Sequence, residues 1–219
     1  MSKVVVINNL TLDGVMQAPG RPDEDTRGGL EHGGWARRPN EDPDIGRAMA
    51  GRMARSGPLL AGRRTYEDFY GFWPHQQVNP FTEVLNNVQR CVASTTLEAP
   101  LPWSNSTLLG GDAAQAVADL KERPREGLVI VGSGELVQSL MRRALIDEYV
   151  LLIHRLVLGS GRRLFRDGGS FAALRLADAV TTATGVVIAT YQSASRRRRR
   201  VPRAEAELVS ARSRRRRAR

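Results

Sequence analysis

The sequence is poor in the residues that build disulfide frameworks, metal centres and membrane spans. Cys91 is the one cysteine in 219 residues, which excludes an intramolecular disulfide, and no Cys/His cluster has zinc-ligand spacing. No apolar run approaches the roughly 18 residues of a membrane helix, and the run after Lys3 is too short for a signal peptide. We therefore expect a cytoplasmic protein that has no bound metal and no membrane segment.

Motifs of several enzyme classes are also missing. The chain has no nucleophile elbow of the hydrolases, no zinc-protease helix motif and no phosphate-binding P-loop. Aromatic residues make up only 5% of the chain, and none lies among the arginines near its C-terminus. That absence argues against sequence-specific recognition of nucleic acid by those arginines.

The net charge of +10 comes from one end of the chain. Residues 196–219 hold 12 Arg and 2 Glu, whereas residues 1–195 hold 21 basic and 21 acidic residues. We predict one folded domain over residues 1–195, followed by an Arg-rich, low-complexity and disordered tail over residues 196–219. Such a tail attracts polyanions, so a non-enzymatic scaffold with a nucleic-acid-binding tail is one function that the sequence leaves open.

The apolar pattern predicts an α/β fold. Short β-branched runs bounded by turn residues are typical of buried strands, and segments of helical period lie between several of them. The predicted strands are residues 4–7, 59–61, 89–93, 128–131, 149–153, 174–180 and 186–190; the predicted helices are residues 44–55, 65–69, 113–121 and about 135–145. This alternation indicates a mostly parallel central sheet flanked by helices, with an antiparallel hairpin at its C-terminal edge that turns near residues 183–185.

Two strand ends carry a glycine followed by a helix, which is the local pattern of an anion site. Gly62 precedes Arg63 and Arg64, and backbone N–H groups at such a helix start bind phosphate. Gly132 and Gly134 form a similar turn, although the third glycine of a dinucleotide motif is replaced by Val137. Plain strand-to-helix turns with solvated arginines remain the alternative for both.

A third strand end, at Ser94 and Thr95, places hydroxyl groups at the same carboxyl edge of the sheet, where open α/β folds bind ligands. Hydroxyls that merely cap a turn are the alternative. The long Gly- and Pro-rich segment 14–43 is either a functional loop or a disordered one, and Trp35 favours a loop that packs.

Taken in order along residues 3–192, these motifs resemble the dihydrofolate reductase-like superfamily, in the branch related to the C-terminal reductase domain of bacterial riboflavin biosynthesis (a bifunctional deaminase-reductase). The blocks that carry the resemblance are residues 11–15, 31–35, 60–67, 131–134, 147–149 and 158–165. The resemblance implies an NADPH-dependent reductase of a pteridine- or ribosylaminopyrimidine-like molecule, such as 5-amino-6-(5-phosphoribosylamino)uracil.

The resemblance also implies the residues that hold NADPH. One of the adjacent arginines would take the 2′-phosphate, and the residues that follow the strand ends would hold the rest of the cofactor. These expected cofactor-binding residues are Gly62, Arg63, Arg64, Thr65, Ser94, Thr95, Gly132, Ser133, Gly134, Glu135 and Leu136. The segment 12–16 would be the loop that closes over the nicotinamide.

On the substrate side, the resemblance implies a carboxylate on the helix before Gly62. Asp44 is the candidate, although it is also a suitable helix N-cap. Glu31, next to His32, and Asp13 complete the set of expected catalytic residues, and Trp35, Phe69 and Trp73 are candidate surfaces for a flat ring or part of the core. We also predict a homodimer, because the apolar segment 147–158 resembles an edge strand that a monomer would expose.

Overall fold

The computed structural model describes residues 2–123 and 127–194. The predicted tail, residues 196–219, and its boundary with the domain lie outside the described residues. The strands are β1 (Val4–Thr11), β2 (Leu59–Gly62), β3 (Arg90–Ala93), β4 (Ser106–Leu109), β5 (Leu128–Val131), β6 (Glu148–His154), β7 (Leu174–Thr181) and β8 (Val187–Ser193). The helices are α1 (Arg37–Asn40), α2 (Pro43–Ser56), α3 (Arg63–Phe72), α4 (Pro80–Asn87), α5 (Ala113–Glu122) and α6 (Gly134–Arg142), with a 3-10 turn η1 (Trp73–His75).

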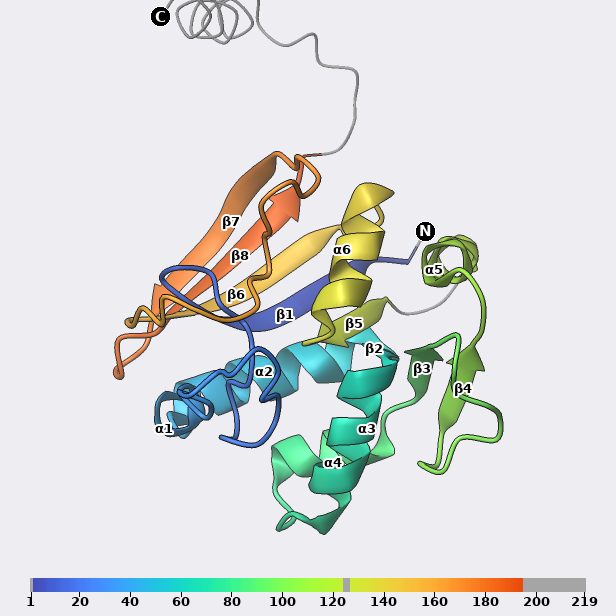
Figure 1. Ribbon diagram of the computed structural model, residues 1–219, viewed down its shortest axis with the longest axis horizontal. Helices are drawn as coiled ribbons and strands as arrows, with labels where there is room; N and C mark the ends of the chain where they lie inside the picture. Colours follow the sequence, from blue (N-terminus) through green and yellow to red (C-terminus); the bar gives the residue numbers. More distant parts are fainter. Residues whose placement is uncertain (1, 124–126, 195–219) are drawn as a thin grey trace, which may run out of the picture.

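The strands form one eight-stranded sheet in the order β4-β3-β2-β5-β1-β6-β8-β7 (Figure 1). The strands from β4 to β6 run parallel to their neighbours, and β8 pairs antiparallel with both β6 and β7. A turn in which Gly185 N–H donates to the Thr182 carbonyl joins β7 to β8. The predicted fold, a mostly parallel sheet with an antiparallel C-terminal hairpin, is confirmed.

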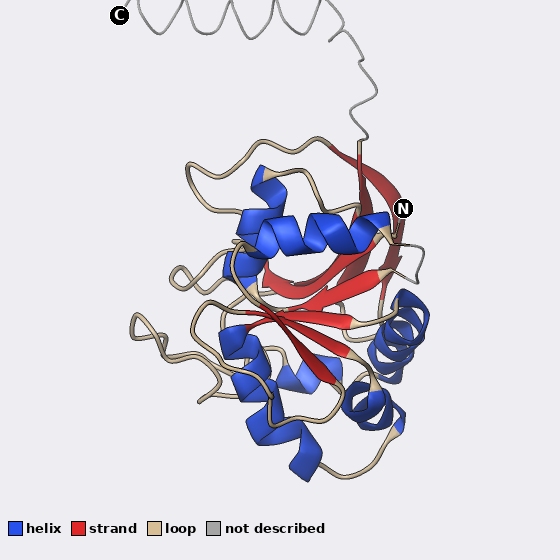
Figure 2. Cartoon of the chain, turned by 90° about the vertical axis from the view of Figure 1, so that its right-hand side faces the viewer, coloured by secondary structure: helices blue, strands red, loops and turns tan. Residues whose placement is uncertain are grey.

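Helices cover both faces of the sheet, as Figure 2 shows. Successive side chains of a strand point to opposite faces, so in β1 Val4 and Val6 pack in the core formed with α5 and α6. Val5 and Ile7 pack in the second core, with α2, α3 and α4. Because β1 is buried on both faces, its first four residues, Val4 to Ile7, are a continuous apolar run rather than an alternating one.

Two details differ from the sequence-based expectations, and a third agrees with them. Strand β4 and helix α4 were not predicted; both are short, and the residues of β4 are half-buried or exposed. The N-cap of α2 is Asp42, whose side chain accepts a hydrogen bond from Asp44 N–H, so the expectation that Asp44 caps this helix is wrong. Trp35 does pack: its indole N–H donates to the Gln17 carbonyl at 2.8 Å, and its ring lies 5.2 Å from that of His154.

The edge of the sheet is also different from the one expected. Strand β6 lies between β1 and β8, so the segment that we expected at the edge is interior. The strand at that edge is β7, which is exposed along nearly its whole length. The premise of the predicted dimer contact was therefore wrong, and β7 takes the place of β6 as the unpaired edge. Within residues 2–123 and 127–194, no helix combines the length and the apolar character needed to cross a membrane.

Candidate functional site

The carboxyl ends of the parallel strands open into one large cleft of about 1880 Å³. The ends of β2, β3 and β5 contribute to its wall, together with the middle of β1 and the long loop that follows β1. All eleven residues that we expected to bind a cofactor line this cleft. The structure therefore brings together three strand ends that lie far apart in the sequence, because parallel strands present their carboxyl ends at the same edge of a sheet.

The turn from β2 into α3 presents an uncapped helix N-terminus to the cleft. Gly62 is the N-cap and has no side chain to accept from the first N–H groups of α3. Arg63 forms an exposed ion pair with Glu67 at 3.2 Å, one helical turn away, whereas Arg64 is exposed at the cleft wall. The uncapped start of α3 and two arginines thus line the same part of the cleft, where an anion can bind.

The turn from β5 into α6 lies against the first turn. Gly62 N–H donates to the Ser133 hydroxyl at 3.0 Å, and a Cβ at Gly132 would lie 3.6 Å from the Thr65 methyl group. Gly132 and Ser133 both adopt positive φ, of 70° and 58°. This backbone turns the chain sharply, and the Ser133 side chain, which is the N-cap of α6, makes no capping hydrogen bond to that helix.

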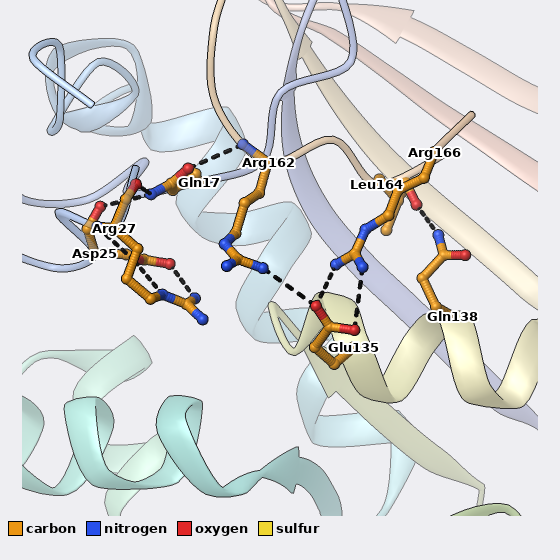
Figure 3. Close-up of polar contacts among 8 residues, drawn as sticks. All are labelled: Gln17, Asp25, Arg27, Glu135, Gln138, Arg162, Leu164 and Arg166. Atoms are coloured by element: carbon orange, nitrogen blue, oxygen red, sulfur yellow. Dashed lines mark hydrogen bonds and ion pairs between the residues drawn. The ribbon is translucent and has the colours of Figure 1, made fainter. Parts of the chain in front are cut away.

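At the start of α6, Glu135 holds two arginines that come from the segment after β6 (Figure 3). Arg166 donates to both of its carboxylate oxygens, at 2.6 and 3.1 Å, and Arg162 donates to one of them at 3.2 Å. The hydrogen bond from Arg166, aided by the charge of Arg162, lowers the pKa of Glu135. The carboxylate is therefore ionised at neutral pH and keeps two guanidinium groups at the cleft wall.

A second contact joins the same segment to the loop that follows β1 (Figure 3). The buried Gln17 side chain donates to the carbonyls of Asp25 and Arg27, at 3.0 and 2.7 Å, and accepts from Arg162 N–H at 2.9 Å. Arg27 forms an ion pair with Asp25, and the hydrogen bonds from Arg27 outweigh partial burial and lower the pKa of Asp25. Gln17 thus fixes the path of the loop beside Glu135.

The third strand end is less specific. Ser94 and Thr95 both line the cleft, but the Ser94 hydroxyl accepts hydrogen bonds from the N–H groups of Thr96 and Leu97, at 3.1 and 3.0 Å. The hydroxyl of Ser94 therefore caps its own turn, as the alternative interpretation of these residues required.

The floor of the cleft near α2 and α3 is apolar. Side chains of both helices, of β1 and of β6 meet there, and several of them also belong to the core on that face of the sheet. The apolar residues that line this part are Ile7, Ile45, Met49, Phe69, Phe72, Trp73 and Leu152. Of the three aromatic residues proposed from the sequence, Phe69 and Trp73 line the cleft, whereas Trp35 packs on His154 outside it.

Comparisons with known proteins agree with this architecture. Residues 2–188 match the family described as the RibD C-terminal domain. This chain belongs to the RibD C-terminal domain family. The uncharacterized protein YyaP of Bacillus subtilis is 27% identical over 158 residues, which cover 68% of this chain and 80% of YyaP.

Solved structures share the fold of this RibD C-terminal domain. A putative riboflavin biosynthesis protein from Shewanella superposes with a TM-score of 0.63 at 22% sequence identity. The superposition covers 87% of this chain and 98% of the Shewanella protein. Dihydrofolate reductase from Enterococcus faecalis, complexed with NADP(H) and RAB-propyl, has a TM-score of 0.55 at 13% sequence identity. That superposition covers 88% of this chain and 97% of the reductase. The expected branch is therefore confirmed at the level of family by the RibD C-terminal domain, and the dihydrofolate reductase-like fold is confirmed as a fold.

In this member of the family, the three expected catalytic carboxylates do not line the cleft. Asp44 is exposed and forms an ion pair with Arg47 on the outer side of α2, and Glu31 is exposed. Asp13 accepts hydrogen bonds from the Thr11 hydroxyl at 2.6 Å and from Gly159 N–H at 2.9 Å. These positions correct the placement expected for all three, because none of the carboxylates faces the cavity.

The segment expected to close over a cofactor is also tied down. Met16 N–H donates to the Arg162 carbonyl, Leu164 N–H donates to the Gly14 carbonyl, and Val15 forms a bridge with Arg163. Of this segment, residues 12–16, only Met16 lines the cleft, and the loop continues along the cavity through residues 17–27.

The sequence analysis missed an acidic group in that loop and on α3. Glu24 and Asp68 both line the cleft, and burial raises the pKa of each carboxyl. Arg21 forms an ion pair with Asp68, and its guanidinium lies 4.1 Å from the centre of the Phe72 ring. In the sequence, the charged run 21–27 within the long segment 14–43 was a signal for functional side chains. No sequence spacing, however, indicates that this run lies beside α3.

Proposed function

We propose that this chain is an NADPH-dependent reductase that transfers a hydride to a small heterocyclic molecule. The observation that carries the proposal is the meeting of two glycine turns, at Gly62 and Gly132, beside the guanidinium groups of Arg63 and Arg64. Fold-level similarity to an enzyme complexed with NADP(H) adds support. Hydride transfer needs alignment and exclusion of water more than covalent help from the protein, and a deep cleft with an apolar floor suits that need.

The residues present fit the phosphates of such a cofactor. The N-termini of α3 and α6 lack side-chain caps, so their first N–H groups are available to the diphosphate. Arg63 and Arg64 would hold the 2′-phosphate through charge-assisted hydrogen bonds, for which Arg63 would exchange its exposed partner Glu67. When bound, NADPH supplies the hydride; the chain binds it, orients it and excludes water.

The substrate side favours a flat, partly polar ring. Phe69 and Trp73 offer aromatic faces in the apolar part of the cleft, and Arg21, Arg27 and Arg162 also line it. A pteridine or a ribosylaminopyrimidine combines a ring for the apolar part with polar or anionic substituents for the arginines. We propose the ribosylaminopyrimidine class, which also fits the similarity to a putative riboflavin biosynthesis protein. The cytoplasmic location remains a prediction.

The test is a reduction assay with two probe substrates, 5-amino-6-(5-phosphoribosylamino)uracil and dihydrofolate. NADPH deuterated at the transferring position is mixed with the protein and each probe, and the products are analysed by mass spectrometry. We expect one deuterium in the product of the ribosylaminopyrimidine. Binding of NADPH without reduction of either probe overturns the substrate class, and absence of NADPH binding overturns the proposed function itself.

A further inference from the structure

One carboxyl group at the cleft differs from its neighbours in what holds it. Asp25, Glu67, Asp68 and Glu135 also line the cleft, and each of them forms an ion pair with an arginine. Glu24 and Glu41 form none within the described part of the chain, but Glu41 is exposed, whereas Glu24 is half-buried. A carboxyl paired with a guanidinium stays ionised at neutral pH, whereas a buried carboxyl without such a partner is favoured in its neutral form.

The geometry around Glu24 is built by the loop itself. Its Oε2 accepts hydrogen bonds from Gly20 N–H at 2.7 Å and from Arg21 N–H at 3.1 Å. A Cβ at Gly20 would lie 3.1 Å from that oxygen, so a glycine leaves room for the close approach. The other oxygen, Oε1, accepts no hydrogen bond from the residues that the structure describes, and it is available to a ligand in the cleft.

The charges that face Glu24 come from its own loop and from α3. Burial raises the pKa of Glu24 and outweighs the two backbone hydrogen bonds; the negative charge of Asp68 raises it further, and Arg21 lowers it. Arg21 is engaged by Asp68 and, at 3.4 Å, by Asp23, and it stacks on the Phe72 ring. The guanidinium is thus engaged by two other carboxylates, and the net effect of burial and of these charges is a pKa of Glu24 above its ordinary value.

We propose that Glu24 is the proton donor of the reduction, an inference that rests on the proposed function. When a hydride reaches the carbon of a C=N or C=O bond, the adjacent heteroatom must take a proton. The O–H bond of the Glu24 carboxyl breaks, an N–H or O–H bond of the product forms, and the carboxylate regains its proton from water. Asp68 acts as a positioning residue, since it holds Arg21 and its negative charge favours the protonated form of Glu24.

The first measurement does not depend on turnover. A ¹³C NMR pH titration of the glutamate carboxyls, with Glu24 assigned by comparison with Glu24→Gln, reports its pKa in the full chain. We expect this pKa to lie above the ordinary 4.5 and to fall in Asp68→Asn, because that change removes the negative charge and frees Arg21. A pKa at or below 4.5, or one that Asp68→Asn leaves unchanged, overturns the proposal.

The second measurement is the rate of NADPH oxidation with 5-amino-6-(5-phosphoribosylamino)uracil. Loss of a proton donor lowers kcat by at least about 100-fold, so we expect this drop in Glu24→Gln together with loss of the pH dependence on that group. The affinity of Glu24→Gln for NADPH stays within about twofold of the wild type. The control is Glu41→Gln, a change at an exposed carboxylate of the same cleft, which keeps the wild-type kcat. A wild-type kcat in Glu24→Gln overturns the proposal. If the wild type binds no NADPH, the proposed function fails instead, and the titration alone decides whether Glu24 holds a proton.

Discussion

Replacing Asp13 with asparagine tests whether this carboxylate ties two loops together. Its oxygens accept from the Thr11 hydroxyl at 2.6 Å and from the N–H groups of Leu158 and Gly159 at 3.2 and 2.9 Å. Asparagine has the same shape but only one acceptor oxygen and no charge. The substitution therefore weakens the link between the loop after β1 and the segment after β6 without removing side-chain volume.

The size of the effect follows from the pKa. Partial burial alone raises the pKa of Asp13, but the hydrogen bonds outweigh it and lower the pKa from 3.8 to about 2. One pKa unit corresponds to about 1.4 kcal/mol of free energy. Solvent screens part of this energy, because the Asp13 side chain is 18% exposed. We therefore expect Asp13→Asn to lower the free energy of unfolding by about 1–2 kcal/mol. Because the folded-state pKa is the lower one, this stability is present above pH 3.8 and is lost as the pH falls through about 2.

Urea unfolding of the wild type and of Asp13→Asn between neutral pH and about pH 2 measures the difference in unfolding free energy. We expect the difference in unfolding free energy between the two proteins to be constant near neutral pH and to become smaller in acid. The affinity of Asp13→Asn for NADPH should stay close to that of the wild type. Asp167→Asn, at an exposed aspartate after β6, is the control and should leave stability unchanged. No difference at neutral pH, or a difference that becomes larger in acid, would refute the reasoning.

Three further predictions concern the edge strand, the arginine pair and α2. In the edge strand β7, Leu176 and Val180 are 51% and 54% exposed. Arg175 lies three residues before Asp178, so antiparallel pairing of two β7 strands can place Arg175 of one copy opposite Asp178 of the other. We therefore expect a homodimer through β7 that Leu176→Lys with Val180→Lys dissociates; light scattering that gives a wild-type monomer at tens of micromolar contradicts this. Arg63→Ala with Arg64→Ala should remove most of any preference for NADPH over NADH, since each hydrogen bond to a charged group contributes about 1.5–3 kcal/mol, and a preference that survives argues against these residues. Asp44→Asn should keep wild-type turnover at every pH, because Asp44 lies outside the cleft; a flattened acid limb would contradict that placement.

The sequence predicted the parts of the fold that local pattern determines. The runs that became β1, β2 and β5 are apolar and end at turn residues, and the helices that follow β2 and β5 begin at glycine turns. Such patterns depend on neighbouring residues, so they can be recognised without the fold. Parallel strand ends then necessarily lie at one edge, which is why the eleven cofactor candidates were found together.

The sequence did not predict the order of strands at the C-terminal edge. Two antiparallel strands were recognised, but nothing local determines that β8, rather than β7, pairs with β6. The segment 147–158 therefore resembled an edge, although β6 is interior. Strand order depends on pairing between distant segments, which period and propensity do not encode.

The carboxylates of the site were also beyond local pattern. Asp44 has the expected separation from Gly62, yet it lies on the outer side of α2, where Arg47 pairs with it. Glu24 reaches the cleft only because Gln17 and a turn at Gly20 direct the loop across it. The orientation of a loop side chain is determined by tertiary contacts of this kind, so only the structure could distinguish Glu24 from the other acidic residues of the segment 14–43.

Binding of NADPH in the cleft is measured by a comparative titration. NADPH and NADH are added separately to the purified protein, and the change in nicotinamide fluorescence gives the two dissociation constants. We expect NADPH to bind at least about tenfold more tightly than NADH, which corresponds to about 1.4 kcal/mol from the 2′-phosphate contacts of Arg63 and Arg64. Equal affinities, a preference for NADH, or no binding of either nucleotide would contradict it.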